Sequence, residues 1–139
     1  MAVKTIPFQV EMAGDTHIEN ITKRVSSAVA DAGLIAGTVT VFVKHTTASV
    51  MIIEDEPGIR ADTKAFWDRV VPADPHWQHN TINPVEDNGH SHLRGQLQGP
   101  SVTVRFLPEQ YGRVHSRATW RRDDRHLGDA RRQSLLLQG

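Results

Sequence analysis

Apolar and polar residues alternate at the start of the chain. Between residues 2 and 12 the apolar side chains fall on every second position, which is the period of a β-strand. Pro7 has no backbone donor, so we expect this strand at the edge of a sheet. The alternating apolar residues are Ile6, Phe8 and Val10.

The apolar period lengthens to that of a helix between residues 18 and 37. Asp15 or Asn20 is expected to cap the start of this helix, and Gly33 is expected to end it. One face of the helix is then apolar and predicted to pack against the sheet. That face consists of Ile18, Ile21, Val25, Ala28, Val29 and Ala32.

Two segments rich in β-branched residues follow and predict two strands, at residues 38–45 and 48–56. In the first segment His45 shares one face with three valines, because side chains two apart point the same way. Only Thr46 and Thr47 separate the two segments, which favours a hairpin between them.

A helix is predicted to begin at Pro57, a residue well placed in a first helical turn, and to run to residue 71. Three acidic residues precede it, Glu54, Asp55 and Glu56, and negative charge there favours the helix N-terminus through its dipole. The stripe expected to be buried consists of Ile59, Phe66, Trp67 and Val70.

The second half of the chain contains a long loop, a short helix and further strands. The loop, residues 72–88, has no clear period, and its length suggests a function. The helix is predicted at residues 90–98. The strands are predicted at residues 100–107, with Val102, Val104 and Phe106 on one face, at residues 111–120 and at residues 133–138.

The segments follow the order β-α-ββ-α-α-βββ, which predicts an α+β fold with a mostly antiparallel sheet and packed helices. A length of 139 residues fits one domain spanning residues 1–139. The absence of cysteine excludes disulfides, a thiolate nucleophile and cysteine zinc knuckles. The first residues lack the apolar core of a signal peptide, and no stretch approaches the ~18 apolar residues of a membrane helix. We therefore expect a cytoplasmic protein that does not enter a membrane.

The net charge is zero, but the charges are distributed unevenly. Residues 105–139 carry eight arginines and four carboxylates. Such a run is ordinarily a solvated surface. The alternative is a site for an anion or phosphate, because each guanidinium offers a planar fork of donors. A near-neutral pI of about 7.1 without interleaved aromatic residues argues against nucleic-acid binding.

Histidine is abundant, with eight residues, and four of them are candidates for chemistry. A catalytic zinc site usually takes three protein ligands and leaves a position for water. The spacing does not fix which ones converge, because residues 90 and 92 of a regular helix point about 200° apart. For His45, a purely structural role as a hydrogen-bonded histidine at the end of a strand is as good an explanation as a role in a site. The four candidates are His45, His79, His90 and His92.

Three segments resemble the YjbQ family, also called UPF0047: HTTASVMIIEDEP, then HN, then EDNGHSHLRGQLQGPSVTV. The resemblance is nearly continuous over residues 38–106, and the N-terminal helix also fits it. It implies a compact α+β subunit that assembles as a homotrimer, with histidines between subunits that hold a divalent metal, usually zinc. It also implies secondary thiamine-phosphate synthase activity, a transferase reaction on a small phosphorylated substrate.

The resemblance assigns roles to individual residues. Its histidine motifs imply His45, His79 and His92 as the metal ligands. Glu54, as general acid or base, and His90, as a reserve ligand or supporting partner, are the catalytic candidates. In the implied reaction two heterocycles are joined as pyrophosphate leaves, and the metal and arginines stabilise the departing charge. The substrate-binding candidates are Thr46, Thr47, Ser49, Arg94 and Trp120.

Two other classes of function stay open. In one, the protein is a non-catalytic trimer whose histidines bind a metal or ligand without turnover. In the other, the metal assists hydrolysis of a small phosphorylated or acyl substrate. Metal analysis of the purified protein and of histidine variants separates a metal site from ordinary polar residues.

The C-terminal third departs from the family pattern. A Gly-Thr-Trp-Gln stretch is usual there, whereas this chain has Ala118-Thr119-Trp120-Arg121. A charged run follows, and it is incompatible with a buried central strand unless its charges are paired. The segment at about 107–132 is therefore expected to diverge, although the ending at residues 133–138 fits the family's last strand.

Overall fold

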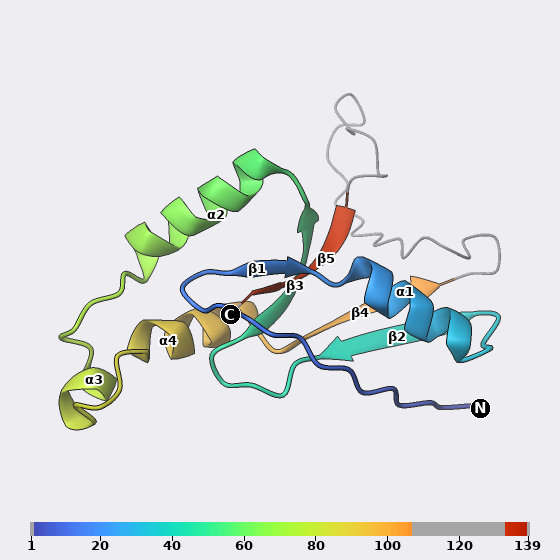
Figure 1. The fold of residues 1–139 in the computed structure, drawn as a ribbon, viewed down its shortest axis with the longest axis horizontal. Helices are drawn as coiled ribbons and strands as arrows, with labels where there is room; N and C mark the ends of the chain where they lie inside the picture. Colours follow the sequence, from blue (N-terminus) through green and yellow to red (C-terminus); the bar gives the residue numbers. More distant parts are fainter. Residues whose placement is uncertain (1, 107–132, 139) are drawn as a thin grey trace.

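The computed structural model describes residues 2–106 and 133–138 and shows an α+β fold with antiparallel strand pairing (Figure 1). Both the predicted fold class and the antiparallel pairing are confirmed. The elements, in chain order, are β1 (Ile18–Asn20), α1 (Thr22–Asp31), β2 (Gly37–Phe42), β3 (Ser49–Glu54), α2 (Pro57–Val70), α3 (Gln78–Ile82), α4 (Gly89–Gln98), β4 (Ser101–Phe106) and β5 (Gln133–Gln138).

The described strands form two sheets rather than one. The first has the order β1-β5-β3, and the second pairs β2 with β4. The predicted hairpin across Thr46 and Thr47 is therefore wrong, because β2 pairs with β4 from Gly37↔Phe106 to Phe42↔Ser101 while β3 pairs with β5. The short connection carries the chain from one sheet to the other.

The start of the chain differs from the prediction in two ways. Residues 2–12 form no strand, and Lys4 and Arg24 hold this segment along α1 by bonds to the carbonyls of Ala32 and Gln9. Residues 18–20, predicted as the first turn of the helix, are the strand β1 instead. The apolar period there was misleading because pairing with the distant β5 outweighs one more helical turn.

The core lies where α1 meets both sheets. Its cluster of buried residues includes Val25 on α1, Val41 on β2 and Val50 on β3. The predicted ends of α1 are confirmed in part: Asn20 Oδ1 accepts a hydrogen bond of 2.9 Å from the Thr22 amide, and Gly33 adopts φ +65° just after the helix.

The helix α2 begins as predicted and packs differently. Glu56 caps it by accepting hydrogen bonds from the amides of Gly58 and Ile59, with Pro57 at the first position. Trp67 is only 6% exposed, but Phe66 and Val70 are 53% and 50% exposed, so the predicted buried stripe is wrong in that half. In Figure 1 the helix α2 extends away from the sheets, which agrees with the partial exposure of these two side chains among the described residues.

The loop predicted at residues 72–88 contains the short helix α3, and α4 and β4 occupy the segments predicted for them. In β4, Val104 and Phe106 are buried as the alternation required. The strand predicted at residues 111–120 lies outside the described residues. Among the described helices, none has the length and apolar character to cross a membrane.

Candidate metal site at the junction of α3 and α4

The junction of α3 and α4 is held by Asn80, which is 9% exposed. Its Oδ1 accepts a hydrogen bond of 2.9 Å from the Gly89 amide, and its Nδ2 donates one of 3.2 Å to the Asp74 carbonyl. A Cβ atom on Gly89 would lie 2.8 Å from Asn80 Oδ1, so only glycine fits at the start of α4. The sequence analysis missed both residues; Asn80 lies inside the quoted HN motif, which was the available signal.

His79 and His92 meet across this junction. Their ring centroids lie 4.8 Å apart, with the planes at 60°. His79 Nε2 is buried and has no hydrogen-bond partner among the described residues. Buried polar atoms ordinarily have a hydrogen-bond partner, so this imidazole nitrogen, beside a second imidazole, is an atom that could bind a ligand. The structure thus brings together two of the three predicted metal ligands.

His90 faces a different environment from His92, as the helical geometry predicted. Burial is the main cause that lowers the pKa of His90 below its usual value, and the nearby positive charge of Arg94 lowers it further. Asp15 and Asp87 oppose this shift. His90 Nδ1 is also buried without a hydrogen-bond partner in the described part of the chain. The neutral imidazole is therefore favoured at His90.

Arg94 is 6% exposed, and its guanidinium is used inside the chain. Nε and Nη2 donate to the Val71 carbonyl at 3.0 and 2.8 Å, and Nη1 donates to Thr16 Oγ1 at 2.8 Å. A longer contact of 3.4 Å joins Nη2 to Asp68. These contacts give no support to the predicted role of Arg94 in holding an anionic substrate.

His45 lies on the exposed connection between β2 and β3. Its Nδ1 shares a 2.9 Å hydrogen bond with Thr47 Oγ1 and accepts a longer one from the Thr47 amide. The connection packs on α4, because a Cβ atom on Gly95 would lie 3.0 Å from the Thr46 carbonyl oxygen. Across residues 2–106 and 133–138, however, no three His, Asp or Glu side chains are grouped to hold a metal. One chain therefore does not bring His45 to the pair His79 and His92.

The other predicted site residues are dispersed. Ser49 is 2% exposed and bonds to Gln98, so it supports the contact of β3 with α4 from inside. Glu54 stands at the opposite end of the same strand, roughly 17 Å away at the usual rise per residue. Next to it, the hydrogen bond from Arg60 is the main cause that lowers the pKa of Asp55. Trp120 lies outside the described residues.

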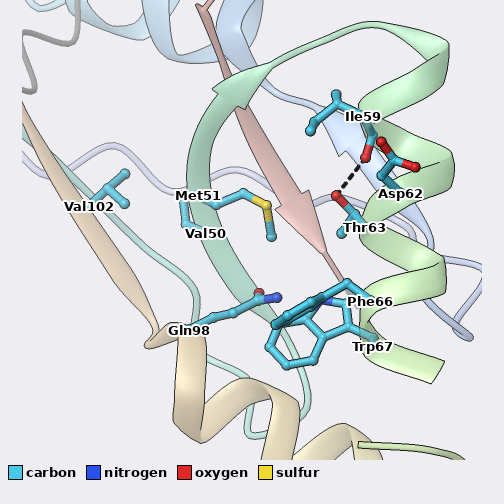
Figure 2. A pocket seen from close by; sticks show the side chains of 9 residues that line it. All are labelled: Val50, Met51, Ile59, Asp62, Thr63, Phe66, Trp67, Gln98 and Val102. Atoms are coloured by element: carbon cyan, nitrogen blue, oxygen red, sulfur yellow. Dashed lines mark hydrogen bonds between the residues drawn. The ribbon is translucent and has the colours of Figure 1, made fainter. Parts of the chain in front are cut away.

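A groove of about 500 Å³ separates α2 from β3 (Figure 2). Phe66 and Trp67 line one side of it and face Gln98 and Met51 on the other. The lining is mainly apolar, and the described residues that form it include no histidine or basic side chain. The sequence analysis did not anticipate this groove. The lining residues are Val50, Met51, Ile59, Asp62, Thr63, Phe66, Trp67, Gln98 and Val102.

Comparison with known proteins gives matches over most of the chain. Residues 6–114 match the family model described as UPF0047 protein YjbQ-like. A UPF0047 protein of Methanothermobacter thermautotrophicus is 32% identical over 104 residues, which is 75% of this chain and 71% of that protein. The UPF0047 protein YjbQ of Escherichia coli O157:H7 is 27% identical and covers 98% of this chain and 96% of its own length.

Solved structures with the same fold support these matches. A crystal structure of an uncharacterized conserved protein of the YjbQ/UPF0047 family from Clostridium acetobutylicum has a TM-score of 0.74 and 26% identity. It covers 96% of this chain and 88% of that one. A hypothetical protein from Aeropyrum pernix K1 has a TM-score of 0.72 and 26% identity, over 94% of this chain and 84% of that one. The fold of this chain is therefore that of known YjbQ-like structures.

Proposed function

The chain belongs to the YjbQ-like UPF0047 family, and from this premise we propose that it binds a divalent metal ion through His79 and His92. The observation that supports this proposal is the buried Nε2 of His79, which lacks a hydrogen-bond partner in the described part of the chain. Neutral imidazole is a common protein ligand for metals, and zinc is the ion we would test first.

The two histidines fit part of a zinc site. Both rings lie at one junction, with centroids 4.8 Å apart, and the chain has no cysteine to compete as ligand. A catalytic zinc ion needs a third protein ligand, which no described residue of the same chain supplies. When bound, the ion would polarise a substrate oxygen or lower the pKa of a bound water.

We propose that the third ligand is His45 of a neighbouring copy in a homotrimer. His45 is exposed on its connection, and its Nε2 would bind the ion in the tautomer whose Nδ1–H donates to Thr47 Oγ1 and no longer accepts from the Thr47 amide. A closed cyclic trimer repeats one contact three times, so every copy would give one ligand and receive one.

Thiamine-phosphate synthase-like transfer, with a small phosphorylated substrate, is the activity to assay in the metal-loaded trimer. Thr46, Thr47 and His90 are the substrate and proton-transfer candidates near α4. The buried, internally bonded guanidinium of Arg94 favours a second candidate function, a trimer that binds metal or ligand without turnover. Metal-assisted hydrolysis of a phosphorylated substrate is the remaining enzyme class, and phosphate release would identify it.

Metal content of the full chain tests the proposal. We expect about one zinc per chain after loading and dialysis, measured by elemental mass spectrometry. His79→Ala and His92→Ala are expected to lose most of it. His76→Ala is the matched control, because His76 lies in the same segment but has a side chain 87% exposed and paired with Asp74. A wild type that binds no metal, or equal retention by all variants, contradicts the proposal.

A mixture of two variants that are each expected to lose the zinc site tests whether the site is shared between copies. If His45 and His79 of one site come from different copies, refolding His45→Ala chains together with His79→Ala chains restores roughly a quarter of the sites by random assortment. Neither variant alone restores any. If both ligands came from one copy, the mixture would bind no more zinc than the separate variants, and the proposal of a shared site would fail.

A further inference from the structure

Arg94 joins three separate segments around its guanidinium. Nε and Nη2 both point at the carbonyl of Val71, the residue that ends α2. Nη1 points at the hydroxyl of Thr16, in the turn before β1. The side chain itself belongs to α4 and is 6% exposed. A buried guanidinium with these partners links the three segments, because its N–H groups donate to atoms of the same chain.

The position of Arg94 on α4 determines where His92 points. Residues two apart on a helix project about 200° from each other. When Arg94 is held against the end of α2, His92 is therefore turned to the other side, where it meets His79. The helix cannot easily slide or roll, because Gly95 lies against the Thr46 carbonyl and the Gly89 amide is bonded to Asn80.

The turn that supplies Thr16 has an unusual backbone. Asp15 and Thr16 have φ of +44° and +64°, and a β-branched residue at positive φ is unfavourable. Such a conformation persists only where the surroundings hold it. In this conformation Thr16 Oγ1 lies 2.8 Å from Arg94 Nη1, so the bond to Arg94 is one contact that stabilises the turn.

We propose that Arg94 is a positioning residue for the pair His79 and His92, acting through the rotation of α4 rather than by binding an anion. This inference rests on the proposed function, since that pair is the proposed metal site. A guanidinium is required, because its planar fork reaches the Val71 carbonyl with two donors and Thr16 with a third. A lysine ammonium is a compact charge without that fork.

The experiment compares Arg94→Ala and Arg94→Lys with Arg60→Ala in the full chain. Arg60 is a matched control: it donates to a backbone carbonyl, that of Ile18, and to a carboxylate, that of Asp55. It lies at the opposite end of α2 from Val71, roughly 16 Å away along the helix. Two quantities are measured: imidazole ¹H–¹⁵N NMR spectra of the metal-free protein and the Kd for zinc.

We expect both Arg94 variants to shift the imidazole signals of His79 and His92 and to raise the Kd for zinc by roughly 10- to 100-fold, the usual effect of losing a group that orients a ligand. Arg60→Ala is expected to lower the melting temperature without either change. If Arg94→Ala behaves like Arg60→Ala, the positioning role is wrong while metal binding stands. If the wild type binds no zinc, the proposed function fails, and the metal-free spectra still decide the role of Arg94.

Thr16→Gly keeps the inference testable should Arg94→Ala fail to fold. It removes the hydroxyl acceptor and also relieves the positive φ, so its loss of stability is expected to be small. We expect its His79 and His92 signals to move in the same direction as those of Arg94→Lys, by a smaller amount. Unchanged signals in both folded variants would overturn the proposal.

Discussion

Single polar side chains decide how the α3–α4 junction closes. Asn80 is buried and satisfies one donor and one acceptor of the backbone on either side of it. Asn83, the residue that follows α3, is exposed, and its side chain makes a single hydrogen bond, to the His79 carbonyl. The two asparagines have the same side-chain chemistry, and they differ in burial and in the number of hydrogen bonds that each side chain makes.

Asn80→Ala is therefore expected to lower the free energy of unfolding by about 1–3 kcal/mol, because it leaves a buried amide without its acceptor. Asn83→Ala is expected to change it by about 0.5 kcal/mol or less, as an exposed substitution. Urea unfolding of both variants measures the difference. Equal losses would mean that the Asn80 bonds contribute no more than a surface bond.

A second residue-scale prediction concerns pH. Asp55 accepts a 2.6 Å hydrogen bond from Arg60 Nε, the main cause of its lowered pKa. Because the folded pKa lies below the unfolded one, this group stabilises the fold above the unfolded value and loses that contribution as the pH falls through the folded value. Asp55→Asn is thus expected to flatten the acid limb of stability against pH, by about 1 kcal/mol or less because Arg60 is partly exposed.

The measurement is urea unfolding at several pH values between neutrality and the acid limb. Asp62→Asn serves as the control, because Asp62 is exposed and lies on α2 two residues after Arg60. An unchanged pH dependence in Asp55→Asn would contradict the assigned role of the Arg60 bond.

At the scale of elements, α2 is amphipathic but only half covered. Trp67 is buried, whereas Phe66 beside it is half exposed, with ring centroids 5.0 Å apart. The two aromatic residues line the groove between α2 and β3 (Figure 2). The apolar period of the helix predicted both side chains as buried, but among the described residues only Trp67 is buried and Phe66 is half exposed.

Trp67→Ala is expected to destabilise the chain by about 3 kcal/mol or more, from lost burial and the cavity left behind. Phe66→Ala is expected to cost about 1 kcal/mol, because half of that side chain already contacts solvent. Thermal and urea unfolding of the two variants tests the order. A Phe66→Ala loss as large as that of Trp67→Ala would show that Phe66 is covered in solution.

At the scale of the whole molecule, the end of the chain holds the first sheet together. β5 lies in the middle of the order β1-β5-β3, so residues 133–138 pair with both neighbours. The described chain therefore has long-range pairing between its beginning and its end (Figure 1). A fold built this way cannot complete its first sheet until its last strand is present.

Deleting residues 133–139 is expected to abolish cooperative urea unfolding, because β1 and β3 then lose their shared partner. Removing the residues before Lys4 is the control, because residues 2 and 3 belong to no strand and Val3 is 82% exposed. Circular dichroism and the unfolding slope measure both. A deleted chain that still unfolds cooperatively would show that the sheet does not depend on β5.

The sequence by itself determined the elements with a strong local signal. The helical period and Pro57 located α2, the histidine-bearing segment was correctly predicted as α4, and the alternation of Val102, Val104 and Phe106 placed β4. The motifs around His45, His79 and His92 also indicated the family that the comparisons confirmed. Local signals succeed there because helix capping, turn chemistry and side-chain period depend on neighbours in the chain.

Only the tertiary structure shows which strands pair and which distant side chains come together. It placed β3 beside β5 instead of β2, turned residues 18–20 into a strand, and brought His79 to His92 but not to His45. It also showed that the guanidinium of Arg94 bonds to the Val71 carbonyl and to Thr16, contacts that the sequence did not indicate. The physical reason is that a periodic pattern identifies which face of an element is apolar, whereas the segment that covers this face is chosen by packing and hydrogen bonding across the whole chain.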